Sequence, residues 1–468
     1  MRALPAALVL AAAVAVAAAL TGCRGGDAQG STTAGPAGAT GARDGASRQA
    51  RAPAAGARDP WTHLTALSAL AARNSGTRAA GTPGGAATER LIAERLEAAG
   101  WTVRFEPVGF PFFDERRPPA VTLPGGRRLR AGTDVRTLEY SAGGSARAGV
   151  SVVGAGRRDA GCRAADWRGF PRGRIAVVRR GTCPFVAKVR AAQSAGAAAV
   201  IVTDPEERGG AGPVRGTLGA PGARIPAVSV GAEAGRALAR ARGTVRLRVD
   251  AVSERRTARN VVADLPGRGG SRTVMAGAHL DSVPDGPGIN DDGSGVSALL
   301  AVATRLAAAP RPRDTVRLGF WTAEELGLYG SRRHVALLSA AERRRLRAYV
   351  NLDMVASPNA VLDTYGGGRA EAALRRALVA RGPAPGRTSI GGASDHAPFQ
   401  RAGVQVAGVF TGASERVTAE DARRFGARAG RAADPCYHRA CDTLANANRA
   451  VLTRVTGAVD AALRSLAG

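Results

Sequence analysis

Hydrophobic residues recur with a helical period near the start of the folded part of the chain. Leu64, Leu67 and Leu70 are spaced at three-residue intervals, which predicts a helix beginning at Trp61. A second helix is expected over about residues 88–99, where apolar side chains share one face and Gly100 ends the pattern. Residues 103–108 form a predicted strand. Two helices followed by an edge strand suit the start of an α/β domain.

The pattern changes twice further along the chain. Between about residues 116 and 256, short valine-rich segments alternate with glycine turns, and one helix is expected around residues 185–195. After residue 260 the sequence predicts strands at 274–280, 315–322, 349–355 and 404–410, and a helix at 295–308. Apolar strands that alternate with turns or helices are typical of an α/β fold whose mostly parallel, mixed sheet carries helices on both faces.

The first segment predicts export. Arg2 precedes an apolar run over residues 3–20, and the sequence continues Leu20-Thr21-Gly22-Cys23. A charged start, an apolar stretch and small residues before a cleavage site are typical of a signal peptide, here residues 1–22. An uncleaved membrane anchor is the alternative. The Leu-Thr-Gly-Cys ending resembles the bacterial lipobox, which implies lipid modification of Cys23. Residues 23–58 have few large apolar residues and are expected to be a flexible tether.

The 468 residues suffice for two cores, and 45% hydrophobic residues with 22% charged residues exclude a polytopic membrane protein and a wholly disordered chain. Lysine and arginine total 66 against 38 acidic residues, a net charge of +28. Apart from Lys188 the basic residues are arginines spread along the whole chain, without a nucleic-acid-binding motif. We therefore expect a solvated basic surface, no nucleic-acid partner and a monomer.

Five cysteines are present, at positions 23, 162, 183, 436 and 441. With Cys23 as the lipid acceptor, four remain to form two disulfides in an oxidising compartment. Three pairings are possible, and proximity favours Cys162 with Cys183 and Cys436 with Cys441. A four-cysteine zinc site would need Cys-x-x-Cys spacing, which the sequence lacks.

Polar residues gather at the ends of the predicted strands after residue 260, where ligands bind in such sheets. Each has an ordinary structural explanation when taken alone, such as a turn or a helix start. Together they supply imidazole and carboxylate groups, which suit zinc, and a carboxylate can bridge two ions. The joint interpretation is a two-metal hydrolase. The residues concerned are His279, Asp281, Asp291, Asp292, Glu324, Glu325, Asp353, Tyr437 and His438.

Two sets of motifs resemble known families. The segment from Arg174 to Phe185, with the helix after it and the apolar run at 199–202, resembles the protease-associated (PA) domain. Six further motifs resemble the zinc aminopeptidases of the M28 family, closest to the secreted streptomycete-type and aminopeptidase Y branches. They are His279-Leu-Asp281-Ser, Asn290-Asp291-Asp292-Gly-Ser-Gly, Glu324-Glu325-Leu-Gly, Asn351-Leu-Asp353-Met, Ser394-Asp395-His396-Ala-Pro-Phe399 and Cys436-Tyr437-His438.

The resemblance implies a peptidase domain in two pieces, residues 59–115 and 257–468, with a β-rich PA domain over residues 116–256 between them. It also implies a role for each site residue. His279 and Asp353 would hold one zinc, Glu325 and His438 the other, and Asp291 would bridge both. Glu324 would be the general base, Tyr437 the transition-state donor, and Asp281 would hold His279. Ala393 departs from the pattern, because relatives carry a basic residue there.

These features predict an extracytoplasmic di-zinc aminopeptidase, lipid-anchored to the outer face of the cell membrane or released. Its substrates would be peptides with a free N-terminus, and an apolar pocket near Phe410 would favour large apolar residues. Three alternatives remain open: a carboxypeptidase or glutaminyl cyclase of the same fold, a non-catalytic surface receptor, and a cell-wall-binding protein attracted by positive charge. The sequence also leaves open whether calcium binds.

Overall fold

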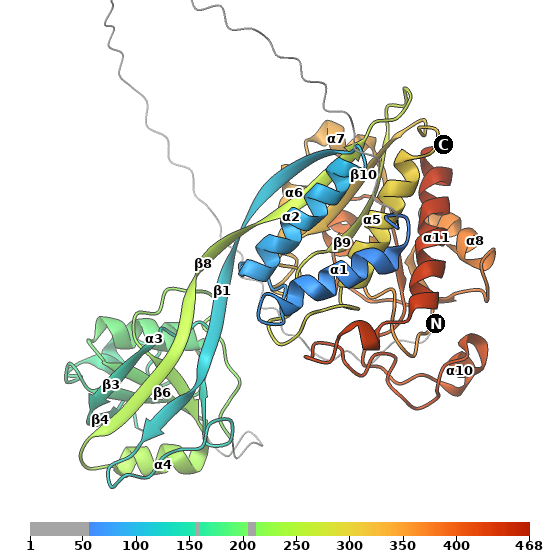
Figure 1. Ribbon diagram of the computed structural model, residues 1–468. Coiled ribbons are helices and arrows are strands. Elements are labelled where there is room, and N and C mark those ends of the chain that lie inside the picture. Colours follow the sequence, from blue (N-terminus) through green and yellow to red (C-terminus); the bar gives the residue numbers. More distant parts are fainter. Residues whose placement is uncertain (1–55, 156, 158, 205–211) are drawn as a thin grey trace, which may run out of the picture. The chain divides into compact units, whose positions relative to one another are not determined.

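The computed structural model describes residues 56–155, 157, 159–204 and 212–468 (Figure 1). The expected signal peptide, Cys23 and nearly all of the expected tether lie outside the described residues. Among the helices that are described, none has both the length and the apolar character needed to cross a membrane.

The larger sheet has nine strands in the order β1-β8-β10-β9-β11-β14-β12-β13, and β3 also pairs with β8. The four central strands β10, β9, β11 and β14 are parallel, while β8 and β12 join them antiparallel. The expected mostly parallel, mixed sheet is therefore confirmed. The bounds are β8 Val245–Leu265, β9 Thr273–His279, β10 Thr315–Trp321, β11 Leu346–Leu352, β12 Asp363–Gly366, β13 Gly386–Arg387, β14 Val406–Phe410 and β3 Gly144–Ala148.

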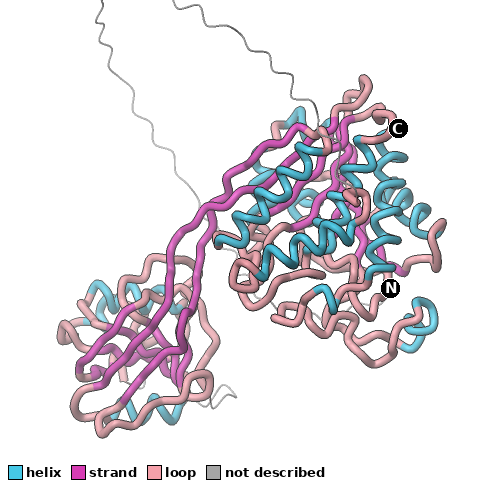
Figure 2. Tube along the Cα trace, in the orientation of Figure 1, coloured by secondary structure: helices cyan, strands magenta, loops and turns pink. Residues whose placement is uncertain are grey.

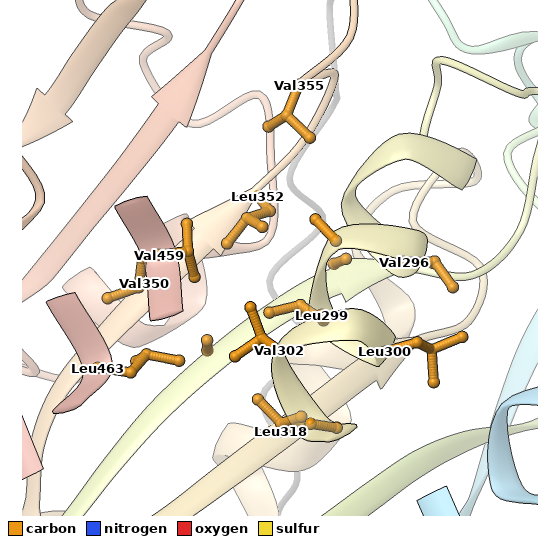
Figure 3. Close-up of a cluster of buried hydrophobic side chains, with 14 of the residues drawn as sticks. Val296, Leu299, Leu300, Val302, Leu318, Val350, Leu352, Val355, Val459 and Leu463 are labelled. Carbon is orange, nitrogen blue, oxygen red and sulfur yellow. The ribbon is translucent and has the colours of Figure 1, made fainter. Parts of the chain in front are cut away.

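Helices cover both faces of this sheet because successive side chains of each central strand point to opposite sides. In β9, Val274 and Ala276 belong to the large core beneath five helices, whereas Met275 belongs to a smaller cluster on the other face. Figure 3 shows part of the large core, including Val302 and Leu318. The helices over the large core are α1 Pro60–Ala72, α2 Pro83–Ala98, α5 Gly293–Ala307, α8 Gly368–Val379 and α11 Arg449–Ala467. The remaining helices of this part are α6 Tyr329–Leu337, α7 Ala340–Arg345, α9 His396–Arg401 and α10 Ala419–Phe425.

Helix α2 and strand β11 have bounds that differ from the sequence-based expectation for physical reasons. Helix α2 begins at Pro83 rather than near residue 88, because the Thr82 side chain accepts a hydrogen bond from the Gly85 amide and Pro83 occupies the first turn. The strand expected at 349–355 ends at Leu352, because Met354 adopts a positive φ of 56° that breaks the extended backbone.

A second sheet of five strands has the order β2-β7-β6-β5-β4 and its own hydrophobic clusters on its two faces. Its strands are β2 Val135–Thr137, β4 Val150–Val152, β5 Ile175–Arg179, β6 Ala199–Thr203 and β7 Ala227–Val230, with helices α3 Phe185–Ser194 and α4 Ala232–Arg240. The Cys162–Cys183 disulfide belongs to this region, and Cys436–Cys441 is the second disulfide, as proximity in the sequence favoured.

Strands β1 (Thr102–Thr122) and β8 pair antiparallel along most of their length (Figure 2). The sequence predicted only residues 103–108 of β1, and its continuation contains prolines at positions 111, 118 and 119, which rarely occur inside strands. β1 tolerates them because it lies at the edge of the sheet and needs backbone partners on one side only. The proposed domain boundaries near residues 115 and 257 fall inside these two long strands.

Candidate metal centre and active site

The carboxyl ends of three parallel strands bring the polar residues together. His279 is the last residue of β9 and lies opposite Trp321, the last residue of β10. Glu324 and Glu325 follow β10 after a short turn, and Asp353 directly follows β11, which pairs with the other side of β9. Residues far apart in the sequence therefore meet at one edge of the sheet, as expected for ligand sites in parallel sheets.

Asp291 lies between two imidazole rings. Its Oδ1 atom is 3.0 Å from Nε2 of His279, and its Oδ2 atom is 3.1 Å from Nε2 of His438. Each imidazole has a second carboxylate beside it. Asp353 Oδ1 is 3.7 Å from His279 Nε2, and Glu325 Oε2 is 3.1 Å from His438 Nε2. Asp291 is thus common to both pairs, and His279 also lies within ligand distance of Asp292 and Asp353 in one group, and of Asp291 and Glu325 in another.

The chemistry of these donors fits zinc. Two imidazoles and three carboxylates are the mixture of nitrogen and oxygen ligands that zinc accepts. The Glu325 Oε1 atom is buried and has no hydrogen-bond partner among the described residues, so it retains a lone pair for a cation. Buried carboxylates also outnumber buried cationic groups here, and such an excess is costly without added positive charge. The residues therefore suit a divalent metal.

The pKa values follow from this crowding. Burial and the Asp291 carboxylate raise the pKa of Glu325 to about 7. Burial also raises the pKa of Glu324 well above its ordinary value. Burial lowers the pKa of His438, but hydrogen bonds to Asp291 and Glu325 outweigh it and raise the value to about 10. The crowded carboxylates thus favour either protonation of their neighbours or a bound cation.

Asp281 holds His279 through its backbone rather than chiefly through its side chain. Nδ1 of His279 is 3.1 Å from the Asp281 carbonyl oxygen and 3.8 Å from the carboxylate Oδ1. That Oδ1 atom instead accepts a hydrogen bond of 3.2 Å from the backbone amide of Glu324. Asp281 therefore links the end of β9 to the turn that carries Glu324, a contact that the sequence did not predict.

Asp292 is close to the same centre, but hydrogen bonds engage both of its carboxylate oxygens. Oδ2 accepts from the backbone amide of His279 at 3.2 Å, and Oδ1 accepts from the amides of Gly295 at 2.8 Å and Met354 at 3.2 Å. The peptide bond between Asp291 and Asp292 is cis. The Asp292 carboxylate lies close enough to His279 and Asp353 to share a metal ion with them. Its hydrogen bonds instead cap α5 and connect that helix to the ends of β9 and β11, so Asp292 is a poor metal ligand.

A buried chain of hydrogen bonds positions Asp353. The Trp321 indole donates to the Tyr349 hydroxyl, and that hydroxyl donates to Oδ1 of Asn351, both at 2.8 Å. The Asn351 amide donates to the Ser394 hydroxyl at 2.8 Å, and Ser394 donates to Oδ2 of Asp353 at 2.6 Å. The sequence motifs contained Asn351 and Ser394 but gave them no role. For Asn351 the available sign was its place among polar side chains at alternate positions of an otherwise apolar strand.

Arg78 is a further residue that sequence reasoning missed. Its side chain is fully buried and donates to the carbonyl oxygens of Leu280, Pro287 and Gly288 at 2.5, 2.9 and 2.5 Å. Burial lowers its pKa, whereas nearby carboxylates, with Asp281 foremost, raise it. Arg78 therefore supplies buried positive charge behind the site. Nothing distinguishes it in a sequence with so many arginines.

Tyr437 and His438 lie in a loop closed by the Cys436–Cys441 disulfide, whose Cα atoms are 5.3 Å apart. The two rings stack with centroids 3.9 Å apart, and His438 has a φ of +59°. Burial, followed by the negative charge of Asp291, raises the pKa of Tyr437. The phenol is therefore protonated over the ordinary pH range and can donate a hydrogen bond.

These residues line a pocket of about 110 Å³. Its apolar wall includes Phe410, where the sequence analysis expected an apolar pocket, and Ala393, which departs from the family pattern. The polar wall consists of His279, Asp291, Glu324, Glu325, Asp353, Ser394, Tyr437 and His438, and the apolar wall also contains Met354, Ile390 and Ala413. A small, partly apolar pocket that opens onto paired carboxylates and imidazoles on an α/β sheet defines a metal-dependent hydrolase.

Comparisons with known proteins specify the family. The model of peptidase family M28 matches residues 260–463, and that of the PA domain matches residues 148–238. "Probable lipoprotein aminopeptidase LpqL" of Mycobacterium tuberculosis is 38% identical over 413 residues, which cover 83% of this chain and 81% of that protein. The chain therefore belongs to peptidase family M28 and contains a PA domain.

Two further relatives agree with this assignment. "Probable leucine aminopeptidase 2" of Aspergillus fumigatus is 38% identical over 340 residues, 68% of this chain and 66% of that protein. The crystal structure of BSAP, a zinc aminopeptidase from Bacillus subtilis, matches with a TM-score of 0.61 at 25% identity, covering 87% of this chain and 95% of that structure. The expected family, fold and peptidase class are confirmed.

Proposed function

We propose that the chain is a two-zinc aminopeptidase that acts outside the cytoplasm and removes apolar residues from the N-termini of peptides. The observation that carries this proposal is the Asp291 carboxylate, which faces His279 with one oxygen and His438 with the other. A carboxylate shared in this way is suited to hold two cations close together. The names of the relatives, which are zinc and leucine aminopeptidases, agree with it.

In this proposal His279 and Asp353 would hold one zinc ion, Glu325 and His438 would hold the other, and Asp291 would serve both. Bound zinc would polarise the substrate carbonyl and lower the pKa of water. Asp281 and Ser394 orient the first pair of ligands through the contacts described above. The disulfide loop orients the second pair by restraining His438.

Glu324 is the proposed general base. It lines the pocket, and burial raises its pKa above the ordinary value, which makes its carboxylate a stronger base. It takes a proton from the attacking water and delivers it to the leaving nitrogen as the peptide bond breaks. Tyr437 donates a hydrogen bond to the carbonyl oxygen as negative charge develops there. Glu324 and Asp353 also offer negative charge to the free ammonium group of the substrate.

The size and lining of the pocket support a preference for apolar residues of moderate size. Met354, Ile390 and Phe410 form an apolar wall, and a pocket of about 110 Å³ accommodates a single side chain. A leucine-like side chain would lose its contact with water on entering it, which favours binding. The relative named as a leucine aminopeptidase supports this choice.

We further propose that the chain is a lipoprotein attached through Cys23, which lies outside the described residues. Two disulfides suit an oxidising compartment, and the M. tuberculosis relative is named as a lipoprotein. Metabolic labelling with a tagged fatty acid tests this assignment. The native chain should incorporate the label, whereas Cys23→Ala should not.

The catalytic proposal is tested with Glu324→Gln and leucine p-nitroanilide. We expect kcat to fall by about 10²- to 10⁴-fold while bound zinc, measured on the same sample, stays at two ions per chain. Glu94→Gln, an exposed residue on α2, is the matched control and should retain full activity. Chelation should abolish the native activity and zinc should restore it. Near-normal turnover by Glu324→Gln would contradict its role, and hydrolysis of N-terminally blocked peptides at comparable rates would contradict an aminopeptidase.

A further inference from the structure

A second hollow of about 690 Å³ lies beside the catalytic pocket and has a basic lining. Three of its lining residues are Arg416, Arg428 and Arg431. The others are small or uncharged, namely Pro358, Asn359, Ser414, Ala432 and Pro435. The family motifs and the proposed chemistry account for none of the three arginines.

Two chain segments connect this hollow to the catalytic pocket. Ala413 lines the catalytic pocket, and the next residue, Ser414, lines the hollow. Pro435 lines the hollow and precedes Tyr437 of the catalytic pocket by two residues. The two segments are hydrogen-bonded to each other, because the Asp434 amide donates to the Ala413 carbonyl at 2.6 Å. The linings of the hollow and of the catalytic pocket are therefore continuous along both chain segments.

Among the described residues, no carboxylate forms an ion pair with the three guanidinium groups of the hollow. Arg416 donates to the carbonyl oxygen of Gly430 at 2.6 Å, which holds its guanidinium in place without neutralising it. In the part of the chain that the structure describes, the guanidinium groups of Arg428 and Arg431 have neither a hydrogen bond nor an ion pair. Glu415 directly precedes Arg416 and keeps its negative charge, but its carboxylate accepts a hydrogen bond from the Ala413 amide at 2.8 Å and not from the guanidinium groups.

We infer that this hollow binds a carboxylate in the part of the peptide that follows the N-terminal residue. The inference rests on the proposed function. The catalytic pocket holds one side chain, so the rest of the substrate must lie outside it, and the basic hollow adjoins its rim. Guanidinium groups bind carboxylates through paired hydrogen bonds. Peptides with an acidic residue, or a free C-terminal carboxylate, shortly after the N-terminal residue are therefore the preferred substrates.

Kinetics on matched peptides test this specificity. Leu-Ala-Glu-amide and Leu-Ala-Gln-amide differ by one charge, and leucine p-nitroanilide carries no carboxylate. We expect kcat/KM for the glutamate peptide to exceed that for the glutamine peptide about fivefold at low salt. The Arg428→Gln/Arg431→Gln double variant should lose this ratio and hydrolyse leucine p-nitroanilide as the native chain does. Arg90→Gln, on the exposed face of α2, should keep the ratio.

A binding measurement separates this inference from the proposed function. The full-length Glu324→Gln chain should bind the glutamate peptide about fivefold more tightly than the glutamine peptide in calorimetry, and adding Arg428→Gln and Arg431→Gln should abolish the difference. Equal binding of the two peptides would overturn the inference even if the enzyme hydrolyses leucine p-nitroanilide. Absence of leucine p-nitroanilide hydrolysis by the zinc-loaded native chain would overturn the proposed function, and the binding ratio would still decide the inference.

Discussion

The two halves of the metal centre are held in different ways. His279 and Asp353 lie at the ends of adjacent strands, and the His279 side chain is only 1% exposed. His438 lies in a short disulfide-closed loop, and its side chain is 39% exposed. The strand-borne half (His279 and Asp353) is thus part of the buried sheet edge, whereas the loop-borne half (Tyr437 and His438) combines a half-buried phenol with a partly exposed imidazole.

The two halves are therefore positioned by different kinds of interaction. The sheet places the strand-borne half through its backbone register, and buried hydrogen bonds then orient the side chains. The loop-borne half has no neighbouring strand, so a disulfide and the buried Asp434 fix its backbone. Asp434 accepts hydrogen bonds from the Cys436 amide and from the side chains of Asn290 and Asn446. Asp291 is the side chain that contacts both halves.

The largest effect is expected where the halves meet. Asp291→Asn removes the shared negative charge and one of the two oxygens that face the imidazoles. We expect turnover of leucine p-nitroanilide to fall by at least about a thousandfold, and zinc content to fall below two ions per chain. Asp285→Asn, an exposed aspartate in the same segment, is the control and should retain both. Full zinc occupancy in Asp291→Asn would show that the halves bind metal independently.

A smaller effect is expected from the support of the strand-borne half. Ser394→Ala removes the 2.6 Å hydrogen bond to Asp353 while leaving every proposed ligand in place. Loss of such a supporting contact typically lowers metal affinity or activity about 10- to 100-fold. Competition with a zinc chelator should reveal weaker retention of one ion only. The exposed Ser271→Ala serves as the control, and an unchanged chelator profile for Ser394→Ala would remove Ser394 from the positioning chain.

The strand-borne half was also the more predictable from sequence. Apolar runs placed β9 and β10 to within one residue, and parallel topology then brought their ends together. The strand before Asp353 was expected three residues too late, at 349–355 instead of Leu346–Leu352. Side-chain orientation was not predictable, because it depends on contacts between distant segments. The Asp281 carboxylate, expected at His279, accepts from the Glu324 amide, and the buried Arg78 resembles every other arginine in the sequence.

The disulfide should matter for the loop-borne half and not for the strand-borne half. Replacing Cys436 and Cys441 by serine removes a short disulfide loop, which contributes about 2 kcal/mol to the free energy of unfolding by restricting the unfolded chain. The replacement also frees the backbone around His438. We expect about a tenfold loss of kcat/KM, since loosely placed catalytic groups act less efficiently. The matched control replaces Cys162 and Cys183, and should leave activity on leucine p-nitroanilide unchanged. Equal losses in both pairs would contradict a local role for the loop disulfide.

The smallest effect on turnover at neutral pH is expected from substitution of His63 in α1, which lies in neither half of the metal centre. Its effect on acid unfolding can therefore be measured without a change at the active site. Burial is the main reason that its pKa falls from 6.5 to about 4, and Nε2 lies 2.8 Å from the Ala57 carbonyl oxygen. The unfolded chain therefore binds a proton at a higher pH than the folded chain. Above pH 6.5 the neutral His63 does not reduce the free energy of unfolding. As pH falls towards 4, protonation of the unfolded chain lowers that free energy by up to about 3 kcal/mol. His63→Gln retains an N–H donor but cannot titrate, so its melting temperature should fall less than that of the native chain between pH 6.5 and 4. If the melting temperatures of the two proteins fell equally between pH 6.5 and 4, His63 would not contribute to acid unfolding. The acid-sensitive groups would then be expected in the two halves of the metal centre.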